Sequence, residues 1–429
     1  MKKTLLLSVV ASTMIMAGGS IAPVEPVVET PEVAASAASG WDFNGQAVVY
    51  YQTTDGQGNG SLFDANGAEK PGFAVAAAGL QLAAVNKDVI GGIGAGFELS
   101  GISDAGLFPD LVDGLVQNAG NGVAADDEEY VLAAGALTQA YLTYGAGNTS
   151  LKVGRQTLPK SLSPFAFSEG WNVFKNTFDA ALLVNTDLPD TTLVGAYVTR
   201  RNNSVGNLND FQQFHGSDGV MMLTAQNKSI SGLTLTGSYY QLPDATAAGD
   251  ATAVWGDAKF KLGGYSVAVQ GGTIGGDAVP EDTTAFGAKI AGNVGMFGAS
   301  VAYSSVDDGT LNIANLAGAG VKTPLYTQAV LNQNTIKRDS DTIKVAAHVK
   351  ALGGKVIAAY ITSDLGATAM GSVFGTGATG EGTYQEIELM YKTKIGQNTK
   401  LFAAFINQND DRQADESQNF VRVWARYSF

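Results

Sequence analysis

One repeated unit runs from Gly40 to the last residue, and it limits the possible folds more than any other feature of the sequence. Each unit is a segment of about ten residues in which apolar residues alternate with others, followed by a connection. Period-two alternation is typical of a β-strand whose two faces meet different surroundings. Eighteen such segments can be recognised, so the pattern predicts an all-β chain of eighteen strands. Two weak segments, DAALLVNT and YSVAVQGG, leave sixteen strands as the alternative.

The connections between these segments alternate between short and long along almost the whole chain. Short turns are predicted at Asn86-Lys87 and Gly263-Gly264, for example, whereas a long link spans residues 305–340. A transmembrane antiparallel barrel threaded up and down has short periplasmic turns and longer outer loops. Residues 41–429 are therefore predicted to form such a barrel, with every long link on the outer side.

Composition excludes several other kinds of protein. Beyond the N-terminal region no run of roughly 18 consecutive apolar residues occurs, so strands are the remaining way across a bilayer. The chain has no Cys, which excludes disulfides and thiolate metal sites. Its formal net charge of −14 argues against nucleic-acid binding, which needs a basic surface.

The N-terminus has the features of an export signal followed by a linker. Two lysines precede an apolar run from Leu5 to Ala17, so residues 1–22 are predicted to be a Sec signal peptide. Residues 23–40 are rich in Pro, Ala and Glu, and are predicted to be a periplasmic linker. A tether that touches peptidoglycan or plugs the lumen is the alternative. Three cleavage sites stay open, after Ala17, Gly19 or Ala22.

Parity along single segments predicts which side chains face lipid. In the last segment Val421, Val423, Ala425, Tyr427 and Phe429 share an apolar face, and Arg422, Trp424, Arg426 and Ser428 share the other. The same test places Lys344, His348, Lys350, Glu386, Glu388 and Lys392 in the lumen. A terminal Phe429 with Tyr427 two residues earlier resembles the signal that barrel-assembly machinery recognises in outer-membrane proteins.

The stretch QAYLTYGAGNTSLKVGRQTL, from Gln139 to Leu158, carries a family resemblance. It is similar to the major outer-membrane porins of Campylobacter-type bacteria and, more distantly, to the OprD-type porins. The matching residues are Tyr141, Leu142, Tyr144, Gly154, Arg155 and Gln156. The resemblance implies a homotrimer of eighteen-stranded barrels and passive diffusion of ions and small solutes, often with cation preference. It also implies that the link after Gln156 folds into the channel.

Residues 156–177 are accordingly the candidate constriction loop, because they mix aromatic, Gly and charged residues. Lys160, Glu169 and Lys175 would then set the narrowest cross-section. Opposed charges across a narrow water-filled pore create a transverse field and determine ion preference. The alternative is an external loop packed on its neighbours.

Six cationic residues are candidates for a basic track along one wall, of the kind that guides anionic solutes. They are Lys152, Arg155, Arg200, Arg201, Arg422 and Arg426. Parity places Lys152, Arg422 and Arg426 in the lumen. Arg155 shares the parity of its lipid-facing neighbours, so it must lie above the lipid or follow a bulge to reach the pore. Arg200 and Arg201 lie at a strand end, where solvated rim charges are the alternative.

A dense acidic run is the candidate for calcium binding or for bridging to lipopolysaccharide. Hard divalent cations prefer carboxylate ligands, although no spaced calcium-loop motif is present, and a solvated charge cluster is the alternative. The run consists of Asp126, Asp127, Glu128 and Glu129.

Three functions remain open at the level of sequence. The first is a diffusion porin for ions and small hydrophilic solutes, and the second is a channel selective for particular solutes. The third is an adhesin or structural outer-membrane protein whose outer loops carry its function. An enzyme is not expected, because the only histidines are His215 and His348, and neither has a spaced Ser or acid partner. No cofactor is expected.

Overall fold

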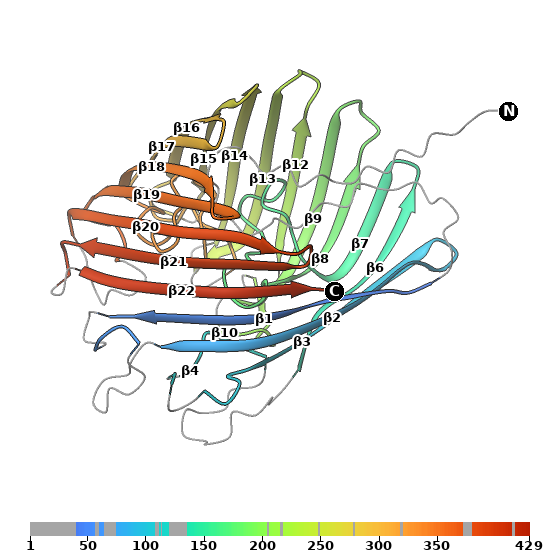
Figure 1. Ribbon diagram of the computed structural model, residues 1–429. Coiled ribbons are helices and arrows are strands. Elements are labelled where there is room, and N and C mark those ends of the chain that lie inside the picture. The colour runs from blue at the N-terminus through green and yellow to red at the C-terminus, as the bar shows by residue number, and fades with distance from the viewer. Residues whose placement is uncertain are drawn as a thin grey trace.

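The computed structural model describes most of the chain after the N-terminal region, and its strands form one closed barrel (Figure 1). No helix within the described ranges is long and apolar enough to cross a membrane. Those ranges are residues 40–55, 60–63, 74–107, 111–112, 114–119, 135–203, 206–214, 218–247, 249–277, 279–317, 321–371, 380–413 and 417–429.

Eighteen long strands build the barrel, so the predicted strand number is confirmed and the alternative of sixteen is wrong. They are β1 (Asp42–Thr54), β2 (Val75–Ile90), β3 (Ile93–Ser103), β6 (Gly135–Ala146), β7 (Thr149–Gln156), β8 (Phe178–Asn185), β9 (Thr191–Arg201), β12 (Val220–Asn227), β13 (Leu233–Thr246), β14 (Gly249–Leu262), β15 (Tyr265–Gly275), β16 (Thr283–Val294), β17 (Phe297–Val306), β18 (Ser340–Ala351), β19 (Gly354–Leu365), β20 (Gly382–Ile395), β21 (Thr399–Asp410) and β22 (Ser417–Ser428). Four strands of two residues lie in the long links: β4 (Gly114–Leu115), β5 (Gln117–Asn118), β10 (Gly206–Asn207) and β11 (Gln212–Gln213).

The barrel closes between its last strand and its first, which lie side by side in Figure 1. The antiparallel register of β22 with β1 continues to the final residue: Gly45 N donates to Phe429 O at 2.9 Å, and Phe429 N donates to Gly45 O at 3.1 Å. Closure removes the exposed strand edges that an open sheet would present. The last residue therefore belongs to the closing ladder.

One predicted turn is displaced. The chain was expected to turn at Asn86-Lys87, but β2 continues to Ile90, with a register shift after Asn86, and the turn falls at Gly91-Gly92. Both of these glycines have positive φ, +59° and +83°. A tight hairpin turn requires that conformation, and Gly adopts it without the steric cost that other residues carry.

The predicted parity of the strands is confirmed. On β18, Ile343 and Val345 are 47% and 45% exposed on the outer face, whereas Lys344 between them is 5% exposed on the inner face. On β20, Ile387 and Leu389 are exposed, whereas Glu386 and Glu388 are fully buried inside. Because a charged side chain is costly against hydrocarbon, this segregation suits a lipid-facing exterior.

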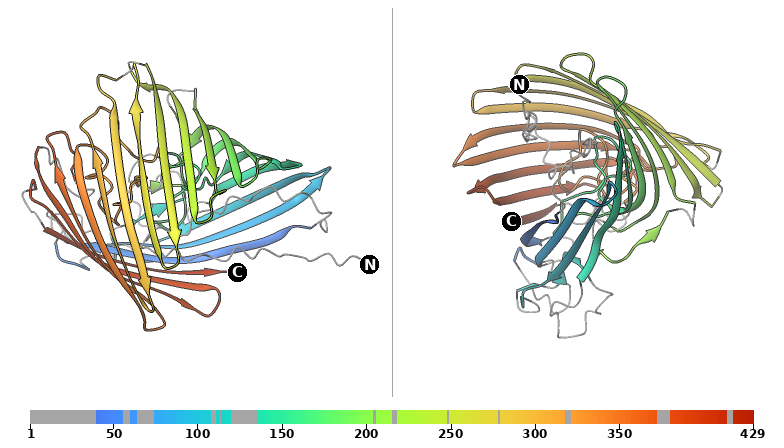
Figure 2. Two further views of the ribbon diagram at one scale, coloured as in Figure 1. Left: turned by 90° about the horizontal axis from the view of Figure 1, so that it is seen from above. Right: turned by 90° about the vertical axis from the view of Figure 1, so that its right-hand side faces the viewer.

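Two long links fold into the barrel, and Figure 2 shows loop segments inside the ring of strands. The first inner loop, residues 157–177, joins β7 to β8, as the resemblance implied. The second inner loop, residues 307–317 and 321–339, joins β17 to β18. The second link was expected to face outward with the other long links, but its described residues fold back into the barrel. Its apolar side chains are buried inside the barrel instead, among them Ile313, Leu325, Val330, Leu331 and Ile336.

Candidate functional site

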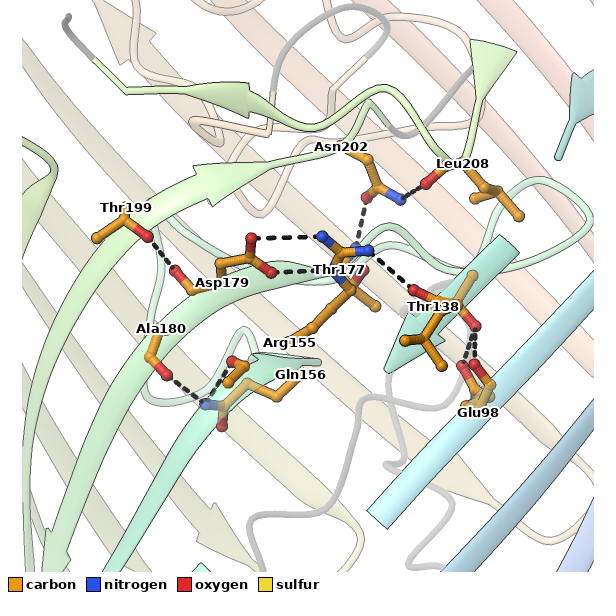
Figure 3. Close-up of polar contacts among 12 residues, drawn as sticks. Glu98, Thr138, Arg155, Gln156, Thr177, Asp179, Ala180, Thr199, Asn202 and Leu208 are labelled. Carbon is orange, nitrogen blue, oxygen red and sulfur yellow. Dashed lines mark hydrogen bonds and ion pairs between the residues drawn. The ribbon is translucent and has the colours of Figure 1, made fainter. Parts of the chain in front are cut away.

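The base of the first inner loop is tied to the neighbouring strand and link (Figure 3). Gln156 at the end of β7 donates from Nε2 to the carbonyl oxygen of Ala180 on β8 at 2.9 Å. Thr177 N donates to Asn202 Oδ1 at 2.7 Å, and Asn202 Nδ2 donates to Leu208 O at 2.8 Å. Both ends of the loop are therefore fixed where it leaves the wall.

Arg155 lies at this base but on the outer face of the barrel. Its Nε donates to Asp179 Oδ1 at 2.9 Å, and these two residues are direct register partners. The parity of Arg155 is that of Leu151 and Val153, both exposed on the outer face. Its guanidinium also stacks 3.3 Å from the ring centroid of Phe211. The structure thus places Arg155 away from the lumen and from the predicted basic track.

Replacing Arg155 with Gln should leave ion selectivity unchanged, because the lost charge is not in the lumen. The half-buried pair with Asp179 should contribute only about 1 kcal/mol to the free energy of unfolding. Reversal potential in planar bilayers tests the first expectation, and thermal unfolding in detergent tests the second. Arg426→Gln is the matched comparison, since Arg426 faces the interior. A shift in selectivity for Arg155→Gln would contradict this placement.

The first inner loop crosses the interior from one wall to the opposite one. At one end Phe165 packs edge-on against Tyr240 of β13 and Trp255 of β14, with ring centroids 5.4 Å apart in both pairs. At the other end Val173 and Phe174 pack with residues of β1 and β2. The loop therefore narrows the lumen along its whole course.

Two wall residues allow this close approach on the β22, β1 and β2 side. A Cβ on Gly79 of β2 would lie 2.7 Å from Phe174 and from Val173, so only Gly lets the loop approach there. Arg426 of β22 donates to the carbonyl oxygen of Val173 at 2.6 Å and also to that of Asn172. Arg426 thus holds the loop backbone instead of standing free in the lumen.

Two of the three predicted constriction charges, Glu169 and Lys160, join the two inner loops. Glu169 is only 5% exposed, and its Oε1 accepts hydrogen bonds from Asn315 Nδ2 at 2.8 Å and from Lys322 N at 2.7 Å. Burial raises the pKa of the Glu169 carboxyl, and the charges of Lys322 and Lys160 oppose that shift. Lys160 Nζ donates to Thr323 O at 2.9 Å. Lys175 is half-buried farther along the loop.

The second inner loop is bound to side chains of the barrel wall. Parity placed Glu386 and Glu388 in the lumen, but the sequence did not predict that they contact this loop. Val330 N donates to Glu388 Oε1 at 2.6 Å, and Leu331 N donates to Glu386 Oε1 at 3.0 Å. On β14, elsewhere on the wall, Asp257 Oδ2 accepts a hydrogen bond from the Tyr326 hydroxyl at 2.6 Å. The two inner loops are thus connected to each other and to the wall.

A group of lysines, which we call the lysine wall, lines the inner face of β14 to β20. In one register row Lys259, Lys289 and Lys344 alternate with two alanines on the strands between them. Alternate strands are roughly 10 Å apart, so the three ammonium groups form a spaced series. In another row Lys355 and Lys392 are direct partners. Apart from Lys344, these side chains remain partly accessible.

The lysine wall differs from the predicted basic track. Of the six residues predicted for that track, Lys152, Arg422 and Arg426 face the interior, while Arg200 is exposed and Arg201 half-buried at the end of β9. Arg422 is nearly buried and donates from Nε to Gln52 Oε1 at 2.8 Å. Parity within each strand could have placed Lys259, Lys289 and Lys355 on the inner face. Which lysines lie side by side, however, depends on the register between the strands.

The acidic run proposed for calcium, Asp126, Asp127, Glu128 and Glu129, lies outside the described residues, as does His215. Within the described ranges no group of three or more His, Asp or Glu side chains is arranged to hold a metal ion. Calcium binding at the outer loops therefore stays a prediction.

Comparison with known proteins identifies the architecture. No protein-family profile matches the sequence, and no curated protein matches it. Solved structures from Pseudomonas aeruginosa do match in fold. OccK9 (OpdG) has a TM-score of 0.69 at 17% identity, covering 91% of this chain and 98% of that one. OpdK with vanillate has a TM-score of 0.67 at 15% identity, covering 90% and 99%.

A further structure, of the outer membrane protein OpdK, has a TM-score of 0.63 at 15% identity and covers 90% of this chain and 99% of that one. The fold is shared. At such low identity the likeness concerns the architecture: a closed barrel of eighteen antiparallel strands. The more specific resemblance to Campylobacter-type porins stays a prediction.

Proposed function

We propose that this protein is an outer-membrane channel through which ions and small hydrophilic solutes diffuse passively. The observation that carries the proposal is the closed barrel with apolar side chains outside and charged side chains inside. Its fold is shared with a protein described as an outer membrane protein, which supports the same location. Export through the predicted signal peptide, residues 1–22, belongs to this proposal, as does a periplasmic position for the short turns.

The charges of the interior favour anions over cations as the preferred ions. The family resemblance implied cation preference, but the accessible part of the inner wall from β14 to β20 carries Lys289, Lys355 and Lys392, together with Lys259, which pairs with Asp257 at 3.2 Å. Rings and rows of cationic side chains favour anions in a pore. OpdK, which shares the fold, was crystallised with vanillate, a carboxylate anion. We therefore propose a channel with a preference for small anions.

Reconstitution into planar bilayers tests the proposal directly. The purified protein should produce stepwise increases in conductance, and a potassium chloride gradient should give a reversal potential on the anion-selective side. A reversal potential of opposite sign would refute the anion preference and support the cation preference that the family resemblance implied. A correctly folded barrel that gives no conductance would favour the alternative of an adhesin or structural protein.

Partners and assembly remain part of the same proposal. A C-terminal strand ending in Tyr427 and Phe429 would be read by the barrel-assembly machinery, and the exposed apolar face would meet lipid and lipopolysaccharide. The resemblance adds a homotrimer. The molar mass in detergent, measured by light scattering, tests the trimer independently of conductance.

A further inference from the structure

The second inner loop is bound to the wall by two carboxylates that are completely buried. Glu386 and Glu388 are two residues apart on β20, a spacing that places both side chains on the inner face. They accept hydrogen bonds from two successive loop amides, Leu331 N and Val330 N. The same strand thus holds the loop backbone at two adjacent points.

Two buried carboxylates this close together carry a desolvation cost and repel each other. Cations from two other elements compensate in part: Lys344 Nζ on β18 lies 3.9 Å from Glu388 Oε2, and Lys322 in the loop lies within electrostatic range of both carboxylates. Among the described residues, Glu388 Oε2 nevertheless has no hydrogen-bond partner. Apolar side chains of similar size would fill this space at a lower desolvation cost. We therefore infer that the carboxylates serve to position the loop more than to stabilise the protein.

The position that they fix determines how much of the lumen the loop fills. Lys344 Nζ also donates to Gln328 O at 2.8 Å, and Ala329 packs with Ala346 and Ala359 on β18 and β19. Residues 328–331 are therefore held against three neighbouring strands. If this segment left the wall, the loop could move within the barrel and change the open area.

We propose that Glu386 and Glu388 are positioning residues that set the open cross-section of the channel, by holding residues 328–331 against β20. The inference rests on the proposed function, because it requires that ions pass through the barrel. Two hydrogen bonds from successive backbone amides fix both the position and the direction of this segment, which suits the holding role. Removing both carboxylates should release the segment and leave the strands of the barrel paired.

Single-channel conductance in planar bilayers tests the proposal. Glu386→Ala combined with Glu388→Ala should raise conductance roughly two-fold or more and increase the fluctuation of the open-state current, because a wider and less ordered pore conducts more. Glu381→Ala is the matched control: Glu381 precedes β20 and is exposed, so its removal should change nothing. Heat-modifiable migration on gels checks that each barrel has folded.

A second variant tests the same contact from the side of the loop. Val330→Pro removes the amide that donates to Glu388 and leaves every wall residue in place. It should raise conductance in the same direction. Because β20 is unchanged in this variant, it decides the question even if the double Ala variant does not assemble.

A reversible tether separates loop release from general damage. The chain has no Cys, so Ala329→Cys with Ala359→Cys offers a single disulfide between loop and wall. In the double Ala background, oxidation should lower conductance towards the wild-type value, and dithiothreitol should raise it again. The inference is overturned if the wild type conducts but Val330→Pro and the double Ala variant do not differ from it. Absence of wild-type conductance would instead overturn the proposed function, and this inference with it.

Discussion

Replacing Phe165 with Ala should loosen the first inner loop and raise single-channel conductance. Phe165 is 1% exposed and contacts the rings of Tyr240 and Trp255 on the opposite wall from Arg426. Truncating a fully packed Phe to Ala costs about 3 to 5 kcal/mol, part of which is the cavity left behind. Because the barrel strands keep their hydrogen bonds, the loss should fall on the attachment of the loop.

Conductance and limited proteolysis measure that loss together. The loop of the Phe165→Ala protein should be cut faster than that of the wild type, while the barrel stays heat-modifiable. Phe286→Ala is the control, since this ring on β16 is half exposed on the outer face. If Phe165→Ala and Phe286→Ala gave the same conductance and cleavage rate, the packing of Phe165 would not hold the loop.

Replacing Lys289, Lys355 and Lys392 together with Gln should reverse or abolish the preference for anions. Lys289 lies within electrostatic range of Lys344, Lys259, Lys160 and Lys355, and Lys392 within range of Lys355 and Lys344. Unit charges about 10 Å apart, the spacing of alternate strands, interact by roughly 1.7 kcal/mol at an effective dielectric constant of 20. Removing three of these charges should therefore change the permeability ratio of chloride to potassium by roughly tenfold.

Reversal potentials at two salt concentrations give the cleanest measurement. The Debye length is about 10 Å at 0.1 M and about 3 Å at 1 M, so the difference between variant and wild type should shrink in concentrated salt. Lys228→Gln is the control, because Lys228 is exposed at the turn between β12 and β13. An unchanged reversal potential in the triple variant would show that the lysine wall does not select ions.

The barrel could be predicted from the sequence because each strand carries its own period-two pattern. Alternation within β18 and β22 predicted which residues lie on the outer face, without reference to any other strand. The turn after β2 was displaced for a local reason. Asn86-Lys87 has turn-forming character, but Gly91-Gly92 accepts the positive φ of a tight hairpin more easily.

The site was only partly predictable, because its contacts join residues far apart in the chain. Val330 and Glu388 are 58 residues apart, and Phe167 and Asn315 are 148 apart. Period-two patterns carry no information about such pairs. The lysine wall depends on register in a similar way, since a shift of one residue in a strand would turn its lysine to the outer face. Only the relative positions of the strands bring Lys259, Lys289 and Lys344 into one row.

Glu169 accepts hydrogen bonds from the Asn315 side chain and from the Lys322 amide, and these bonds join the two inner loops into one unit. Glu169 and Asn315 are 146 residues apart in the chain. Replacing one loop with that of another barrel, without its counterpart, would leave a carboxylate or an amide in the interior without a hydrogen-bond partner. Each such buried polar group lowers the free energy of unfolding by about 1 to 3 kcal/mol. Chimeric channels that exchange both segments should therefore assemble more readily than chimeras that exchange one. Any engineering of what passes through this barrel has to treat the two segments as one transplanted unit.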